Sequence, residues 1–148
     1  MAKKAKYGLG RFRKKVFIID NSVLLKAFFE EEGGETVRRI LRMAAKKQTT
    51  LLAPTLMVFE FLNVLSKSLK DIDDIKDGFK KFKKLAIGFI DPEDKYVLSA
   101  LENISEKKQI SYYDASYHAL AKDYDAIFLT TDRKYFSAMK EKGNIWLF

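Results

Sequence analysis

Short apolar segments that alternate with helical stretches constrain the fold of this chain more than any other feature. The segments are Val16–Ile19, Leu51–Ala53, Ala126–Leu129 and Ile145–Phe148, with Leu85–Ile90 as a weaker fifth. None alternates strictly between polar and apolar residues, so we expect strands that are covered on both faces. Strands separated by helices form βαβ units. The sequence therefore predicts an α/β domain with a parallel sheet of about four to five strands and helices on both faces.

Glycines, prolines and candidate caps indicate where the helices between these segments begin. Gly33-Gly34 predicts a turn, Pro54 suits the first turn of a helix, and Asp91-Pro92 is a second start signal. The expected helices are Val23–Phe29, Thr36–Lys47, Pro54–Leu69, a helix from Pro92 to about Lys108, one that starts at Ser111, and Arg133–Lys142. The segment Phe79–Lys84 mixes aromatics with lysines; an amphipathic helix with Phe79 and Phe82 packed inward explains it better than contact with RNA.

Positive charge is concentrated at the start of the chain. The 148 residues carry a net charge of +8, and the first 15 contain seven lysines and arginines and no acid. We therefore expect a basic tail over residues 1–15 and a single domain over residues 16–148. The tail could hold phosphate backbones without sequence preference, or it could be a solvated extension that aids solubility. The sequence favours neither.

Absent residue types exclude several classes of function. The chain has no cysteine and one histidine, His118, so disulfides, thiolate chemistry, histidine-rich zinc sites and two-histidine ribonuclease chemistry are excluded. His118 is expected to be a packed or surface residue. Neither of the two common glycine-rich phosphate-binding motifs, G-x-x-x-x-G-K-[ST] and G-x-G-x-x-G, occurs in the chain. No signal peptide or membrane-spanning run is apparent, and we expect a cytoplasmic protein.

Two aspartates directly follow predicted strands. Asp20 follows the first predicted strand in the string V-F-I-I-D-N-S, and Asp132 follows a later one in I-F-L-T-T-D-R. Parallel strands would bring both acids to one edge of the sheet. An N-cap of the following helix would explain either aspartate alone. Ligands of open α/β sheets bind at the carboxyl ends of the strands, so this edge is where a site is expected.

Glu60 and Asp114 stand in predicted helices. Glu60 is surrounded by apolar residues in P-T-L-M-V-F-E-F-L-N-V-L, which predicts a helix that is buried on nearly every side. A buried carboxylate without a basic neighbour normally pairs, becomes neutral or binds a cation. Asp114 and Ser111 fit a capping box, and this role is compatible with metal binding. If Asp20, Glu60, Asp114 and Asp132 share one edge, their negative charges repel one another. A bound hard divalent cation is the best explanation for four acids in one place.

Four segments of the chain resemble, in order, the four acidic motifs of the PIN-domain family. They are V-F-I-I-D-N-S, P-T-L-M-V-F-E-F-L-N-V-L, S-Y-Y-D-A-S-Y-H-A-L-A and F-L-T-T-D-R-K-Y-F. The similarity is greatest to the VapC-type toxins of prokaryotic toxin–antitoxin pairs, and it extends from about Val16 to Phe148. It implies a three-layer α/β/α sandwich. It also implies a Mg²⁺- or Mn²⁺-dependent endoribonuclease whose catalytic and metal-binding residues are Asp20, Glu60, Asp114 and Asp132.

The resemblance also assigns supporting roles and partners. Ser22, Asn63 and Thr130 match family positions, and Ser22 and Thr130 would orient a carboxylate or a water behind the metal ligands. Lys134 stands where many relatives have a further acid, so a second metal would be weakly held. VapC-type proteins are typically homodimers inhibited by a protein antitoxin. An RNA-processing or quality-control nuclease, or an inactive RNA-binding or scaffold protein, remains the alternative to a toxin.

Overall fold

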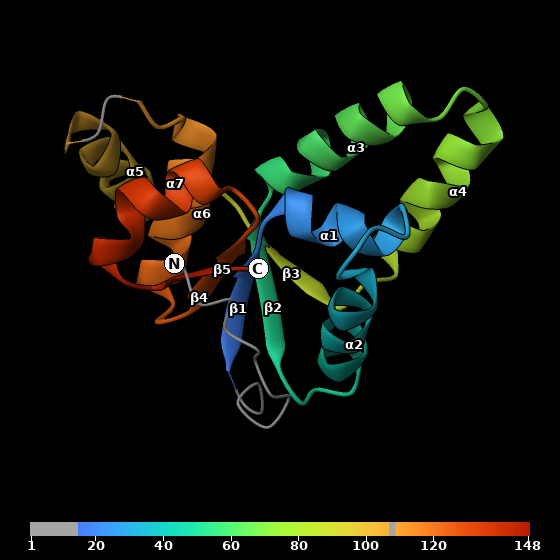
Figure 1. Cartoon of the computed structure of the whole chain (residues 1–148), viewed down its shortest axis with the longest axis horizontal. Helices are drawn as coiled ribbons and strands as arrows, with labels where there is room; N and C mark the ends of the chain where they lie inside the picture. Colours follow the sequence, from blue (N-terminus) through green and yellow to red (C-terminus); the bar gives the residue numbers. More distant parts are fainter. Residues whose placement is uncertain (1–14, 107–108) are drawn as a thin grey trace.

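The computed structural model describes residues 15–106 and 109–148, and its elements alternate as the sequence predicts (Figure 1). The predicted tail lies outside the described residues, apart from Lys15. The elements are β1 (Val16–Ile19), α1 (Asn21–Phe28), α2 (Gly34–Ala45), β2 (Thr50–Pro54), α3 (Leu56–Ser68), α4 (Ile72–Lys83), β3 (Ile87–Ile90), α5 (Asp94–Glu106), α6 (Tyr112–Asp123), β4 (Ile127–Thr130), α7 (Arg133–Met139), a 3-10 turn (Lys140–Lys142) and β5 (Ile145–Leu147).

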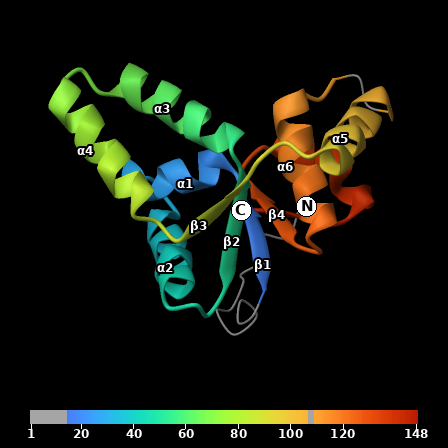
Figure 2. The same cartoon turned by 180° about the vertical axis from the view of Figure 1, so that it is seen from behind.

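The sheet is five-stranded and parallel throughout, in the order β3-β2-β1-β4-β5. Helices α1 to α4 cover one face, and α5 to α7 cover the other (Figures 1 and 2). The predicted three-layer α/β/α sandwich is therefore confirmed. The chain leaves central strand β1 toward β2 and later returns on the other side to β4, so β1 and β4 flank the point at which the strand order reverses. In sheets of this type ligands bind there, beyond the carboxyl ends of the strands.

Two predicted helix starts were wrong. Pro54 does not open a helix; it is the last residue of β2, opposite Ile90 of β3. Proline has no backbone N–H to donate, and the next residue, Thr55, donates its own to the Ile90 carbonyl at 3.0 Å. Asp91 does not cap the following helix, which begins at Asp94; the Asp91 carboxylate instead accepts a hydrogen bond from the Thr55 hydroxyl at 2.7 Å.

The strands form the centre of the core. Phe17, Ile18 and Ile19 of β1 are fully buried, in agreement with a strand covered on both faces. Aromatic packing extends the core toward α4, where the Phe61 and Phe82 rings stack with centroids 4.3 Å apart. The predicted inward packing of Phe79 and Phe82 is thus confirmed. No described helix is long and apolar enough to cross a membrane.

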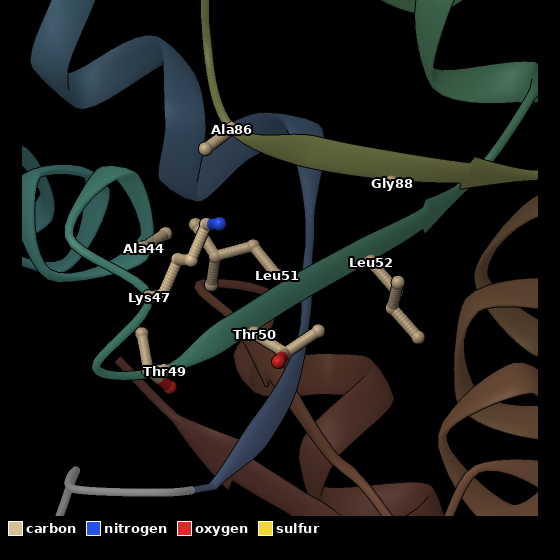
Figure 3. Close-up of a pocket in the computed structure, with 8 residues that line it drawn as sticks. All are labelled: Ala44, Lys47, Thr49, Thr50, Leu51, Leu52, Ala86 and Gly88. Atoms are coloured by element: carbon tan, nitrogen blue, oxygen red, sulfur yellow. The ribbon is translucent and has the colours of Figure 1, made fainter.

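A cavity of about 390 Å³ lies at the amino end of β2 (Figure 3). It is lined by Ala44, Lys47, Thr49, Thr50, Leu51, Leu52, Ala86 and Gly88. Thr49 and Thr50 stand where β2 begins, so the cavity is at the opposite end of the sheet from the acids that follow β1 and β4. It contains none of the residues that the sequence singles out for chemistry.

Helices α1 and α2 approach so closely that the first residue of α2 must be glycine. A Cβ atom added to Gly34 would lie 2.4 Å from the backbone oxygen of Lys26 in α1. Backbone on both sides cannot move aside as a flexible side chain can. This contact fixes the angle at which α2 leaves α1.

We expect Gly34→Ala to lower the free energy of unfolding by about 1–3 kcal/mol, the usual cost of overpacking. Gly88→Ala is the matched control, because its Cβ would meet the mobile end of the Leu52 side chain. Urea unfolding of both variants measures the difference. Equal losses at the two positions would show that the α1–α2 contact is not the constraint.

Candidate active site

The four acids come from both faces of the sheet and meet at its carboxyl edge. Asp20 follows β1 and caps α1, and Asp132 follows β4 and caps α7. Glu60 belongs to α3 on one face and Asp114 to the first turn of α6 on the other. The acids are close enough to affect one another's pKa. Asp20 and Asp114 raise the pKa of Glu60, and Asp132 raises that of Asp114, each in addition to the larger effect of burial.

Asp20 lies at the floor of the site. Its side chain is buried, with the residue only 8% exposed, and burial raises the pKa of its carboxyl group. The Thr130 hydroxyl donates to Oδ2 at 2.8 Å, and the Ser22 backbone N–H donates to Oδ1 at 3.4 Å. These donors favour the ionised form, while burial and the charge of Asp114 oppose it.

Glu60 differs from its prediction. Helix α3 is not buried on nearly every side: Phe59 is 69% exposed, Asn63 is exposed, and Glu60 itself is half-buried. Its neighbours are apolar in sequence because the exposed part of α3 also carries apolar side chains. Asn63 lies on that exposed part, and it is the Tyr117 hydroxyl of α6 that donates to Glu60 Oε1, at 2.7 Å. The hydrogen bond joins two helices on opposite faces of the sheet.

Asp114 and Ser111 form the predicted helix cap, with one difference from a full capping box. The Asp114 backbone N–H donates to the Ser111 hydroxyl oxygen at 3.1 Å, and that hydroxyl donates to Asp114 Oδ2 at 2.9 Å. The carboxylate therefore receives the serine hydroxyl where a full capping box has the cap's backbone N–H. Its pKa is raised, first by burial and then by Asp132.

Asp132 stands at the exposed rim and caps α7, since its Oδ1 accepts the Tyr135 backbone N–H at 2.9 Å. Its own backbone N–H donates to the Thr130 hydroxyl oxygen at 3.1 Å. Thr130 is fully buried, and its single hydroxyl accepts from Asp132 and donates to Asp20. One side chain thereby connects the acids that follow β1 and β4.

No described lysine or arginine forms an ion pair with any of the four acids. Like charges this close in a partly buried site repel strongly, and hydrogen bonds from neutral donors offset that repulsion only in part. A cation between the carboxylates would offset it directly. The charge balance of the site thus favours a bound cation.

The donor atoms fit a hard divalent ion. Among the described residues, no three acidic or histidine side chains are placed so that they could already hold one metal ion. Glu60, Asp114 and Asp132 each keep one oxygen that accepts no hydrogen bond from the described residues. Carboxylate oxygens are the ligands that Mg²⁺ and Mn²⁺ prefer. The chemistry of these oxygens therefore suits such an ion.

Two residues at the site, Tyr117 and Thr131, were not identified from the sequence. Tyr117 is buried beneath Glu60, and burial with the charge of Glu60 raises the pKa of its phenol, so it remains a proton donor. Thr131 donates to the Ser22 hydroxyl at 2.8 Å. The spacing of Tyr117, three residues after Asp114, placed it on the same helix face and was the only available signal. His118 is a packed residue, as predicted, and is fully buried.

Comparison with protein-family models matches the PIN domain to residues 17–142. Among solved structures, the VapBC2 complex of Rickettsia felis bound to a promoter DNA fragment has a chain that is 17% identical, with a TM-score of 0.68 over 90% of this chain and 97% of that one. A toxin–antitoxin complex from Klebsiella pneumoniae gives 13% identity and a TM-score of 0.63 over 87% and 94%.

A third similar structure is VapC20 of Mycobacterium tuberculosis, described as a toxin that cleaves the sarcin–ricin loop. It is 12% identical, with a TM-score of 0.60 over 82% of this chain and 94% of that one. At these identities the likeness shows the fold. A search of curated proteins finds no match.

We expect Thr130→Val to lower the free energy of unfolding at neutral pH by about 1.5–3 kcal/mol, the usual value of a hydrogen bond to a charged group. The Thr130 hydrogen bond lowers the pKa of Asp20, so its loss raises that pKa further. The penalty is largest where Asp20 is ionised and shrinks as the pH falls and Asp20 is protonated in both proteins.

Thr49→Val is the matched control, because the buried Thr49 hydroxyl donates to the Lys15 carbonyl at the opposite end of the sheet and to no carboxylate. Its penalty should vary little with pH. Urea unfolding of both variants between about pH 4 and pH 8 measures the two profiles, because this range begins near the ordinary pKa of a carboxyl group and extends well above it. A Thr130→Val penalty that is independent of pH would refute the link to Asp20.

Proposed function

The chain belongs to the PIN-domain family, and we propose that it is a Mg²⁺- or Mn²⁺-dependent endoribonuclease that acts as the toxin of a toxin–antitoxin pair. The observation that carries the proposal is the meeting of four carboxylates at one sheet edge with no ion pair from the described basic side chains. Carboxylates that raise one another's pKa are costly to keep together, and a bound cation would offset that cost. The solved VapC20 structure, described as a sarcin–ricin-loop-cleaving toxin, has the same fold, which supports the proposal.

In this proposal Asp20 and Asp114 bind the ion directly, and Glu60 and Asp132 bind it directly or through water. The bound ion would supply an activated water and offset negative charge on the phosphate. Thr130 holds Asp20 in place through its 2.8 Å hydrogen bond, and Tyr117 holds Glu60 through its 2.7 Å hydrogen bond. Such partners behind the ligands fix carboxylate orientation and so preserve the geometry for in-line attack.

Exposed apolar side chains support the proposed protein partners. Phe59 of α3, Leu98 and Leu101 of α5, and Tyr113 of α6 are each at least 49% exposed. Phe59 and Tyr113 are on the helices that also carry Glu60 and Asp114, so they suit an interface beside the site, and Leu98 and Leu101 offer further apolar contact on α5. We propose that these side chains contact the antitoxin and a second copy of the chain, and we expect the protein to act in the cytoplasm.

The test is cleavage of a structured RNA by the purified chain in Mn²⁺. We expect cleavage to be lost in EDTA. In Asp20→Asn, which alters a direct ligand, the fall should exceed the roughly 10- to 100-fold loss that is usual for a partner behind the ligands. Asp74→Asn, which changes an exposed acid of α4, is the matched control and should cleave like the wild type.

Three outcomes would contradict the proposal: cleavage that persists in EDTA, equal cleavage by Asp20→Asn, or RNA binding with no cleavage in any divalent ion. The last result would indicate an RNA-binding or scaffold protein. Co-expression with a neighbouring small reading frame tests the toxin assignment separately. An inhibited complex is expected.

A further inference from the structure

His118 connects the two helices that carry Asp114 and Asp132. It lies one turn after Asp114 in α6, is fully buried, and has a partner at each ring nitrogen. Nδ1 is 3.0 Å from the Tyr135 hydroxyl of α7, and Nε2 is 2.7 Å from the Gly143 carbonyl before β5. We call these three residues the His118 bridge.

The partners determine the tautomer of the imidazole. The Gly143 carbonyl can only accept, so Nε2 carries the proton and donates it. Nδ1 is then unprotonated and accepts from the Tyr135 hydroxyl. Burial lowers the pKa of His118 to about 4, so this neutral form persists at neutral pH. Both ring nitrogens of the buried His118 thus have hydrogen-bond partners, one from α7 and one from the turn before β5.

Tyr135 extends the bridge to the site. Its hydroxyl reaches His118, and its backbone N–H donates to Asp132 Oδ1 at 2.9 Å. The Phe128 ring packs against both His118 and Tyr135, with centroids 6.0 and 5.9 Å away, and limits their movement. The position of Asp132 relative to α6, and hence to Asp114, therefore depends on a hydrogen bond in the core.

We propose that His118 is a positioning residue that sets the separation of Asp114 and Asp132 through Tyr135, and thereby the affinity of the site for a divalent cation. An apolar side chain would satisfy packing in this core without the desolvation cost of an imidazole. The bridge gives that imidazole a specific use. The inference rests on the proposed metal-dependent function.

Two substitutions of His118 each remove one of its two hydrogen bonds and keep the other. His118→Asn keeps an acceptor near Nδ1 for Tyr135 and loses the Gly143 contact, whereas His118→Gln keeps a donor near Nε2 for Gly143 and loses Tyr135. Tyr135→Phe removes the hydroxyl alone. Each variant loses one buried hydrogen bond, so we expect similar decreases in the urea midpoint for all three.

Mn²⁺ affinity, measured by calorimetry, should separate them. We expect His118→Gln and Tyr135→Phe to weaken Mn²⁺ binding by about 10-fold or more, the usual effect of losing a partner behind a metal ligand. His118→Asn should stay near the wild-type affinity. The double variant of His118→Gln with Tyr135→Phe should be no weaker than either alone, because both break one contact.

The proposal is overturned if His118→Gln and Tyr135→Phe bind Mn²⁺ like the wild type, or if His118→Asn loses affinity as they do. The chain has one histidine, so its ¹⁵N spectrum reports the tautomer directly, and a proton on Nδ1 would also overturn the bridge. Failure of the proposed function looks different: the wild type itself would neither bind Mn²⁺ nor cleave RNA.

Discussion

Repulsion among four carboxylates is the constraint on which the site depends. The fold forces them together, because parallel strands end at one edge and Asp20 and Asp132 follow adjacent strands. Burial and mutual repulsion raise the pKa of Asp20, Glu60 and Asp114. A raised pKa adds stability at low pH that is lost as the pH rises through the folded-state value. The metal-free site is thus least favourable at neutral pH, where a cation would bind most strongly.

Hydrogen bonds hold the four carboxylates, none of which forms an ion pair with a described basic side chain. Thr130 donates to Asp20, Tyr117 to Glu60, and Ser111 to Asp114. Each donor is neutral, so it orients an acid without cancelling its charge. A lysine or arginine in the same place would cancel the negative charge that the proposed cation would offset. This arrangement preserves both geometry and negative charge.

Helix α6 organises much of this network. Asp114 faces the site, Tyr117 reaches across to Glu60 of α3, and His118 holds Tyr135 of α7. Residues 115–121 are all buried, and the small side chains among them let the helix lie close to the sheet. Neighbouring residues of one helix therefore serve different acids.

The sheet was predictable because its strands are short apolar runs separated by clear turns, and the order of the acids followed from that alternation. Helix α4 was expected only at its Phe79–Lys84 end, and Pro54 gave a wrong helix start because proline also fits the last position of a strand. The burial of Glu60 was overestimated because apolar residues on an exposed surface, such as Phe59, resemble core residues in sequence. Tyr117 and Tyr135 could not be assigned, since their partners lie 57 and 17 residues away along the chain.

Chemical unfolding in a titration of Mn²⁺ at neutral pH tests the central claim that these acids form a cation site. The account predicts that the free energy of unfolding rises by about 1.4 kcal/mol per tenfold increase in Mn²⁺ above its Kd. Asp20→Asn should show a much smaller rise. A wild-type unfolding curve that does not change with Mn²⁺ or Mg²⁺ would contradict the account.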